Sequence, residues 1–480
     1  MLRSTLIYAP AILATRLSAL LILVIATRLV NLDEYGLLAL VVTIGEMTDV
    51  AIANWLRVAL LRLGGKGDVT QGSLWMAGRI LLVSMVIALF VSTTVSIVVV
   101  PERMIEFSIA VGAYLVAGAV NRFALTTLQM QQRHVAYSML EFSRAALQLV
   151  LPIGAILVFP HSFLTVSLGS SAAVLLAGFV AAFVASSRLV PGPARFSWVE
   201  FMKLGLPLIA MAVVSFGLSN FERIVLKVYY DAGSVAIFAA AYALARQPID
   251  MLANAVNMGA FPEAVSRFDA DGPKAAADYL SQLLALILGL VLPAATLLVA
   301  LSDPLVQLLL PADYYGKFSV LFPLIAASVV FSNVTSFVYG TMILAHKRSR
   351  SLISGAVVGS LATIGLSYLL IPGLAGTGAA IALVAGSFIN LVAIYLISER
   401  LTPVPIPWRE LGLSVLIAVV AGGLAGFINA ALVHEAAIVR LIVGGGAGAL
   451  AFIGLNIALR FQETVEIVVL ARAKCGGAKC

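Results

Sequence analysis

Two stripes of polar side chains lie inside apolar stretches of this chain. Each combines arginine with carboxylates or amides: Glu46, Asp49 and Arg57 in one stretch, and Arg246, Asp250, Asn254 and Asn257 in another. At 100° per residue, each set falls within an arc of about 80° on one helix face. Guanidinium groups suit phosphate oxygens, and neighbouring carboxylates can carry protons or cations. The stripes therefore predict a hydrated anion site with acids beside it.

Further residues of the same kind extend this candidate site. Basic residues outnumber acidic ones inside the apolar stretches, and a charge at the centre of a membrane span costs about 2.5–3.5 kcal/mol, so the surplus favours an anionic guest. The candidate anion ligands are Arg16, Arg57, Arg122, Arg144 and Arg246. The candidate cavity and ion-coupling residues are Glu46, Asp49, Glu141, Glu222, Asp250, Asn254 and Asn257.

Simpler interpretations stay open for several of these residues. Arg57 and Asp49 could form an ion pair that only holds helices together. Arg246 and Asp250 could do the same at the i,i+4 spacing of one helix. Four other basic residues lie near the ends of apolar stretches, where charged heads reach the interface: Arg28, Arg79, Lys227 and Arg440.

About fourteen membrane-spanning helices are expected to position these side chains. The chain is 61% hydrophobic and 11% charged, with a mean hydropathy of +1.07. One span needs about 20 apolar residues whose backbone groups bond within the helix. We expect spans at 6–30, 35–61, 75–100, 107–130, 137–159, 163–187, 201–229, 235–260, 279–301, 319–344, 351–371, 376–397, 411–433 and 436–459.

Polar, proline-bearing linkers suggest how the spans are grouped. We predict an N-lobe at 1–187, a linker at 188–200, a C-lobe at 201–398, and two last spans with a tail at 399–480. The expected fold class is therefore an all-α integral membrane protein with two six-helix lobes and two C-terminal helices.

Outside the apolar stretches, lysine and arginine lie almost wholly in alternate loops, and the other loops carry only Arg103 and Lys317. By the positive-inside rule, both termini face the cytoplasm. The net charge of +7 is then a topology signal. It indicates no nucleic-acid partner, because no basic run is paired with aromatic residues on a soluble domain.

Cys475 and Cys480 fall in the tail and lack the four-ligand set of structural zinc.

An internal repeat is expected between the two halves. The turn NLDEYGLLALVV resembles YYDAGSVAIFAAAYAL, and aligning their glycines gives an offset of 197 residues. This offset pairs Asp49 with Arg246 and Arg57 with Asn254. The junctions TLQMQQRHVAYSMLE and TMILAHKRSRSLISG also match. An offset of six spans preserves orientation, so the lobes would be parallel repeats with substrate between them.

No catalytic arrangement is present in the sequence. The four histidines lie in loops or at span ends, and no Walker A, G-x-S-x-G or H-E-x-x-H motif occurs. We therefore expect that the protein is not an enzyme and that it needs no cofactor.

Four segments carry a family resemblance: RLVNLDEYGLLALVVTIGEMTDVAIANWLRVALLR, SNFERIVLKVYYDAGSVAIFAAAYAL, MGAFPEAVSRF and IPGLAGTGAAIA. Over nearly its whole length, the chain resembles the polysaccharide-transporter branch of the multidrug/oligosaccharidyl-lipid/polysaccharide (MOP) exporter superfamily. The resemblance implies two lobes in a V that alternate between inward-open and outward-open states. It also implies that a polyprenyl-diphosphate-linked oligosaccharide is flipped across the bacterial inner membrane for O-antigen, capsule or exopolysaccharide synthesis.

The resemblance further assigns roles to particular residues. In the related lipid II flippases, arginines of the first, second and eighth spans line the cavity, and Arg16, Arg57 and Arg246 occupy comparable places. The last two helices of that group form a groove for the lipid tail. Relatives with a sodium site use an acid on the seventh span, here Glu222, plus Asn or Asp on the eleventh, which here offers only Thr363 and Ser367.

Sodium coupling is therefore no better supported than a proton or the membrane potential. Implied partners are membrane lipids, a polysaccharide polymerase and a chain-length regulator, and the protein is expected to be monomeric. The alternatives left open are a cation-coupled drug exporter of the same fold, a membrane glycan polymerase or ligase, and a non-transporting scaffold.

Overall fold

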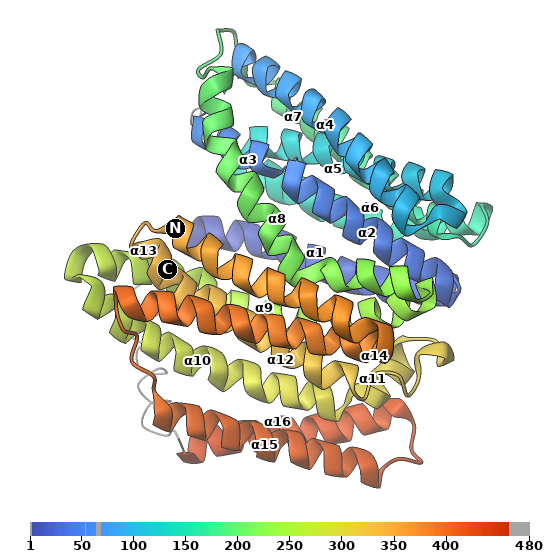
Figure 1. Cartoon of the computed structure of the whole chain (residues 1–480), viewed down its shortest axis with the longest axis vertical. Helices are drawn as coiled ribbons and strands as arrows, with labels where there is room; N and C mark the ends of the chain where they lie inside the picture. The colour runs from blue at the N-terminus through green and yellow to red at the C-terminus, as the bar shows by residue number, and fades with distance from the viewer. Residues whose placement is uncertain (1, 53, 64–68, 460–480) are drawn as a thin grey trace. The chain divides into compact units, whose positions relative to one another are not determined.

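The structure is a computed structural model that describes residues 2–52, 54–63 and 69–459, and these fold almost entirely into α-helices (Figure 1). Among them, eleven helices are long and apolar enough to cross a membrane. The expected all-α membrane fold is thus confirmed. The tail that contains Cys475 and Cys480 lies outside the described residues.

The helices of the first half follow the predicted spans closely. They are α1 (Leu2–Leu29), α2 (Leu32–Ile52), α3 (Asn54–Leu63), α4 (Gln71–Val99), α5 (Met104–Met130), α6 (His134–Val158), α7 (Phe163–Ser186) and α8 (Trp198–Tyr229). The second predicted span corresponds to the candidate span Leu32–Leu63, in which α2 and α3 lie on either side of residue 53. Two short strands, β1 (Val69–Thr70) and β2 (Leu189–Val190), pair in parallel, and a 3₁₀ turn, η1 (Pro101–Arg103), follows α4.

The second half is also helical along its predicted spans. Its helices are α9 (Ala232–Asp271), α10 (Pro273–Ala300), α11 (Ser302–Leu309), α12 (Leu321–Val334), α13 (Gly340–Ala345), α14 (Ser349–Leu401), α15 (Trp408–Ala431) and α16 (Ala437–Leu459). A 3₁₀ turn, η2 (Ala312–Tyr314), follows α11, and a π-helix, η3 (Thr335–Tyr339), joins α12 to α13. In α14, Ala375 has φ 49° and ψ −130°, so this element is two predicted spans that meet at a kink.

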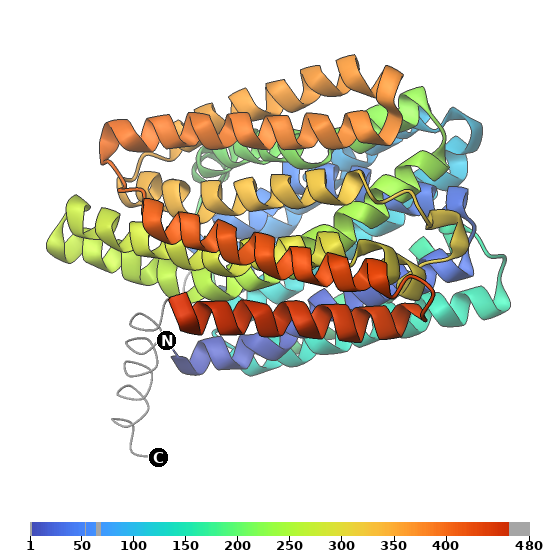
Figure 2. The same cartoon turned by 90° about the horizontal axis from the view of Figure 1, so that it is seen from below.

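The chain forms two compact units. They are Met1–Ala240 with Ser360–Ala382, and Ala241–Gly359 with Leu383–Cys480. In the first unit, α8 packs on α3 through Trp55 and Phe201, whose ring centroids lie 5.4 Å apart. In the second, α15 and α16 lie side by side, as the red helices of Figure 2 show. The boundary between the units does not fall at the linker 188–200, and the division into lobes in a V stays a prediction.

Two matching turns support the internal repeat. The turn after α5 places Gln132 at φ 56°, and the turn after α13 places Lys347 at φ 59°. In each, the N–H of the following residue donates to the carbonyl five residues back, at 3.0 and 3.2 Å respectively. Positive φ is uncommon for residues other than glycine. Its recurrence at the two junctions that match in sequence favours a common structural unit.

The structure corrects the register of the other match. Asn31 caps α2 and Asp231 caps α9, because each side chain accepts a hydrogen bond from the N–H three residues further on, at 2.9 and 2.7 Å. The equivalent helix starts are thus 200 residues apart, and the offset of 197 is wrong. In the corrected register Glu46, rather than Asp49, corresponds to Arg246.

The aligned glycines gave the wrong offset because they do not occupy equivalent positions in the repeat. Both lie instead at one contact between α2 and α9. The first turns of α2 and α9 approach closely, so that a Cβ on Gly36 would overlap the carbonyl of Ala232. A Cβ on Gly233 would lie 3.1 Å from Asp33 Oδ1. Each glycine is needed where the other helix passes, whatever its place in the repeat.

Replacing Asp231 by alanine is expected to destabilise the protein by about 0.5–2 kcal/mol, the usual cost of losing an N-cap. Hydrogen bonds from the backbone and side chain of Ser234 lower the pKa of Asp231. This contribution is therefore present above the ordinary aspartate range and is lost as the pH falls through the lowered value. Thermal unfolding in detergent at neutral and acid pH measures both effects.

The matched control is Asp231→Asn, because asparagine caps α2 in the same way without a titrating group. It should retain most of the stability and lose this part of the pH dependence. An Asp231→Asn variant that weakens in acid as much as the wild type would contradict the assignment.

Candidate functional site

The first predicted stripe lies along the candidate span Leu32–Leu63. Its Asp49 is on α2 and its Arg57 on α3. Asp49 is only 4% exposed, and its Oδ2 accepts a hydrogen bond from Arg122 Nη1 on α5. The alternative of an Arg57–Asp49 pair is therefore not the arrangement seen, because Asp49 pairs with Arg122 instead.

Arg57 keeps a charge that no carboxylate balances within the described part of the chain. Its Nη2 donates to Gln129 Oε1 on α5 at 3.4 Å. Arg57 and Arg122 also line one small cavity between α3, α4 and α5; the other lining residues are Leu56, Leu81, Ala119, Phe123 and Thr126. Its volume of about 10 Å³ holds about one water molecule. Two guanidinium groups thus converge on a cavity that must widen to admit a phosphate.

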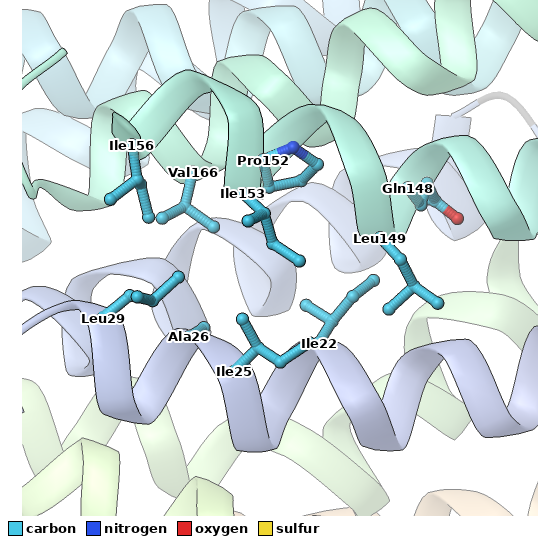
Figure 3. A pocket seen from close by; sticks show the side chains of 10 residues that line it. All are labelled: Ile22, Ile25, Ala26, Leu29, Gln148, Leu149, Pro152, Ile153, Ile156 and Val166. Carbon is cyan, nitrogen blue, oxygen red and sulfur yellow. The ribbon is translucent and has the colours of Figure 1, made fainter. Parts of the chain in front are cut away.

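Arg144 is held by its own helix, α6. It donates from Nε to Glu141 Oε1 at 3.0 Å and from Nη2 to Glu141 Oε2 at 2.8 Å, and it also bonds Gln148. Gln148 borders an apolar crevice where α1 and α6 face each other (Figure 3); its other lining residues are Ile22, Ile25, Ala26, Leu29, Leu149, Pro152, Ile153, Ile156 and Val166. Since Glu141 balances its charge, the role of Arg144 as a phosphate ligand stays a prediction.

The other candidates of the first unit lie on α1, α2 and α8. Glu46 is exposed on α2, and Arg16 lies on α1 with its side chain outside the described part of the structure. Glu222 is fully buried on α8, as are Thr363 and Ser367 on α14. Within the described ranges, no group of three acidic, histidine or cysteine residues could hold a metal ion. The ion-coupling role of Glu222 stays a prediction.

In the second unit, Asp250 is the centre of a polar cluster. Its Oδ2 accepts from Arg246 Nε at 2.8 Å, and its Oδ1 accepts from Asn333 Nδ2 at 3.1 Å. Arg246 also donates to the hydroxyl of Tyr242, and its guanidinium carbon lies 5.3 Å from the centroid of that ring. The i,i+4 ion pair that the sequence left open as a simpler interpretation is present. The side chain of Arg246 nevertheless stays 40% exposed, which leaves it accessible to a guest.

The two asparagines of this stripe face different surroundings. Asn254 Nδ2 donates to the backbone carbonyl of Asp250 at 2.6 Å. Asn257 Oδ1 is buried and has no hydrogen-bond partner within the part of the chain that the structure covers. Only Asn254 therefore belongs to the Asp250 cluster.

Sequence reasoning missed three residues of these clusters, Gln129, Tyr242 and Asn333. Tyr242 stands one helical turn before Arg246, and Asn333 is a lone amide inside an apolar span, so a search for polar residues in spans would have found both. Asn333 also stands two residues before the start of the π-helix η3. Short π-helices are frequent at functional sites because they shift side chains out of the regular helix register.

Replacing Asn333 by alanine is expected to destabilise the second unit by about 1–3 kcal/mol, because a part-buried carboxylate oxygen of Asp250 loses its donor. Denaturant unfolding in detergent measures this cost. Asn456→Ala is the matched control, since that amide donates only to the carbonyl of Phe452 on its own helix. Equal losses in both variants would contradict a specific link between Asn333 and Asp250.

The position of Arg440 differs from the sequence-based interpretation, which placed its charged head at the membrane interface. Arg440 does not reach the interface but is 5% exposed, with Nε donating to Asn429 Oδ1 at 2.9 Å and Nη1 to Gln307 Oε1 at 3.3 Å. Arg440 thus links α16 to α15 and α11 by hydrogen bonds. Position near a span end did not reveal this, because the amide partners come from two other helices.

Solved structures that share this arrangement of helices are membrane transporters. The lipid II flippase MurJ in an inward closed conformation matches with a TM-score of 0.75 and 14% identity, over 96% of this chain and 100% of that chain. The eukaryotic MATE transporter AtDTX14 matches with a TM-score of 0.57 and 17% identity, over 87% and 99%. A mutant of the Vibrio cholerae MATE transporter VcmN matches with 0.51 and 13%, over 83% and 96%. At these identities the likeness establishes the fold, which this chain shares with MurJ and the MATE transporters.

The chain belongs to the polysaccharide biosynthesis protein family, whose model matches residues 25–320. The search of curated proteins found no match to this chain. The membership expected from the sequence is therefore confirmed for a family of polysaccharide biosynthesis proteins.

Proposed function

We propose that the protein is a flippase for a polyprenyl-diphosphate-linked oligosaccharide. The observation that carries the proposal is the pair of arginines, Arg57 and Arg122, on one cavity, with no carboxylate on Arg57 among the described residues. A diphosphate satisfies such donors with charge-assisted hydrogen bonds. The family description and the fold of a lipid II flippase support a lipid-linked glycan as the cargo. A cationic drug would be repelled by the same charge.

In the proposed cycle, the diphosphate competes with Asp49 for Arg122. The side chain of Arg122 is 33% exposed and that of Asp49 is 6% exposed, so the arginine can turn to a guest while the acid stays buried. A buried carboxylate without its partner costs several kcal/mol. Uptake of a proton or cation by Asp49 removes that cost. We propose that cargo binding is coupled to ion uptake in this way, and that Arg246 and Asp250 act likewise in the second unit.

Binding by the purified protein tests the proposal. A polyprenyl-diphosphate oligosaccharide should bind saturably and displace a labelled copy of itself, and the same lipid with a monophosphate should bind about tenfold more weakly, since one charge-assisted contact is worth roughly 1.5–3 kcal/mol. A cationic dye such as ethidium should not compete. Competition by the dye, with no binding of the diphosphate, would favour the drug exporter.

The many apolar helices make this a multi-pass membrane protein. We further propose that it lies in the bacterial inner membrane as a monomer with both termini in the cytoplasm, next to a polysaccharide polymerase and a chain-length regulator. It moves its cargo without chemical change and is therefore proposed to be a transporter rather than an enzyme.

The two cysteines provide a test of this orientation. The sequence has no cysteine besides Cys475 and Cys480, both after the last span. A membrane-impermeant maleimide should label inverted membrane vesicles and leave intact spheroplasts unlabelled. Cys475→Ser/Cys480→Ser is the control for background. Labelling of intact spheroplasts would place the C-terminus on the outer side.

A further inference from the structure

A pocket of about 520 Å³ opens on the first unit at the start of α4. Its lining residues are Gln71, Leu74, Trp75, Gly78, Arg79 and Leu82 of α4 with Leu189 of β2. This volume falls within the ~300–1,000 Å³ range of sites for small ligands. The residues of α4 recur every three or four positions, so they form one face of the helix.

Arg79 is the charged group of this pocket. It is exposed, and no hydrogen bond or ion pair joins it to any residue that the structure describes. Arg79 stands two turns after Gln71, roughly 12 Å along α4 at 1.5 Å per residue, and helical side chains lean back toward the N-terminus. The guanidinium can therefore reach the membrane–water interface, where it can bind an anion.

Exposed apolar side chains flank Arg79 along α4. Trp75 is 71% exposed and Leu82 is 68% exposed. Exposed tryptophan is typical of the boundary between headgroups and acyl chains, because its ring is apolar and its N–H is polar. The face thus offers a cation at headgroup level and apolar surface beneath it.

The neighbouring segments carry two further arginines. Segments 69–82 and 186–197 contain Arg79, Arg188 and Arg195, and the nearest acids in sequence, Asp68 and Glu200, stand just outside them. The two segments are joined by the pairing of β1 with β2 and by Thr70 Oγ1, which donates to Pro193 O at 2.9 Å. Basic pockets at the cytoplasmic side of membrane helices bind anionic headgroups.

We propose that this pocket binds an anionic phospholipid of the bilayer. Its phosphate pairs with Arg79, its acyl chains lie along Leu74 and Leu82, and the ring of Trp75 packs at the glycerol level. The lipid balances a charge that the chain leaves unpaired within the described residues, and it holds the linker 188–200 at the membrane surface.

Native mass spectrometry of the delipidated full-length protein tests this proposal with phosphatidylglycerol and phosphatidylcholine of the same acyl chains. The wild type should retain phosphatidylglycerol in preference. Arg79→Gln should weaken its retention about fivefold, the contribution of one basic residue at a membrane surface. Arg79→Lys, which keeps the charge, should retain it.

Arg409→Gln is the matched control, because Arg409 is exposed beside a 75%-exposed Trp408 and lies outside the pocket. It should bind phosphatidylglycerol like the wild type. Equal retention by wild type and Arg79→Gln, or equal losses in Arg79→Gln and Arg409→Gln, would overturn the site. Preferential displacement of phosphatidylglycerol by free polyprenyl diphosphate would also overturn it, since the pocket would then bind cargo.

Discussion

Replacing Arg57 by alanine is expected to reduce glycan export roughly 10- to 100-fold. A hydrogen bond between a guanidinium and a phosphate contributes about 1.5–3 kcal/mol, and this arginine has no carboxylate partner among the described residues that would already occupy it. Its loss removes a ligand of the cargo without exposing a buried acid. Surface glycan in a strain that depends on this gene measures the effect, with membrane abundance followed in parallel.

Arg62→Ala is the matched control for Arg57→Ala. Arg62 lies on the same helix, α3, and is exposed. Its removal changes the net charge by the same amount, so it should leave export within the range of the wild type. Normal export by an abundant Arg57→Ala protein would show that the arginine does not hold the cargo.

Replacing Arg122 by alanine is expected to destabilise the first unit by about 3–5 kcal/mol. The reason is Asp49, which is 4% exposed and would remain as a buried charge without its partner. The loss should be smaller in acid, because a protonated carboxyl no longer carries that charge. Denaturant unfolding in detergent at two pH values measures the cost.

The double variant Asp49→Ala/Arg122→Ala separates the pair from its surroundings. It removes both charges and should be more stable than Arg122→Ala alone, so that the two substitutions are strongly non-additive. Additive losses would show that the ion pair contributes nothing. In that case the proposed exchange of Arg122 between Asp49 and the cargo would lose its physical basis.

The fold followed from the sequence because every span must close its own backbone hydrogen bonds in lipid. Long apolar runs therefore predicted the helices, and even the kink at Ala375 fell between two expected spans. The second predicted span likewise corresponds to the candidate span Leu32–Leu63.

The candidate site was predicted in its residue types but not in its pairings. The i,i+4 pair of Arg246 and Asp250 lies within one helix, and helical spacing alone was enough to find it. The partners of Asp49 and Arg57 come from α5, about 70 residues away in sequence, and no local pattern indicates which distant helix will pack there. Register failed for a related reason, since Gly36 and Gly233 match in type while serving a contact between helices.

The central claim is that this chain alone moves a diphosphate-linked glycan across a bilayer. The most direct test reconstitutes the purified protein with a fluorescent polyprenyl-diphosphate oligosaccharide in both leaflets and adds an impermeant quencher outside. Wild-type vesicles should lose the protected inner-leaflet fluorescence over time, whereas Arg57→Ala vesicles and protein-free vesicles should retain it. Retention of that signal by correctly folded wild-type protein would show that this chain does not flip the lipid-linked glycan on its own.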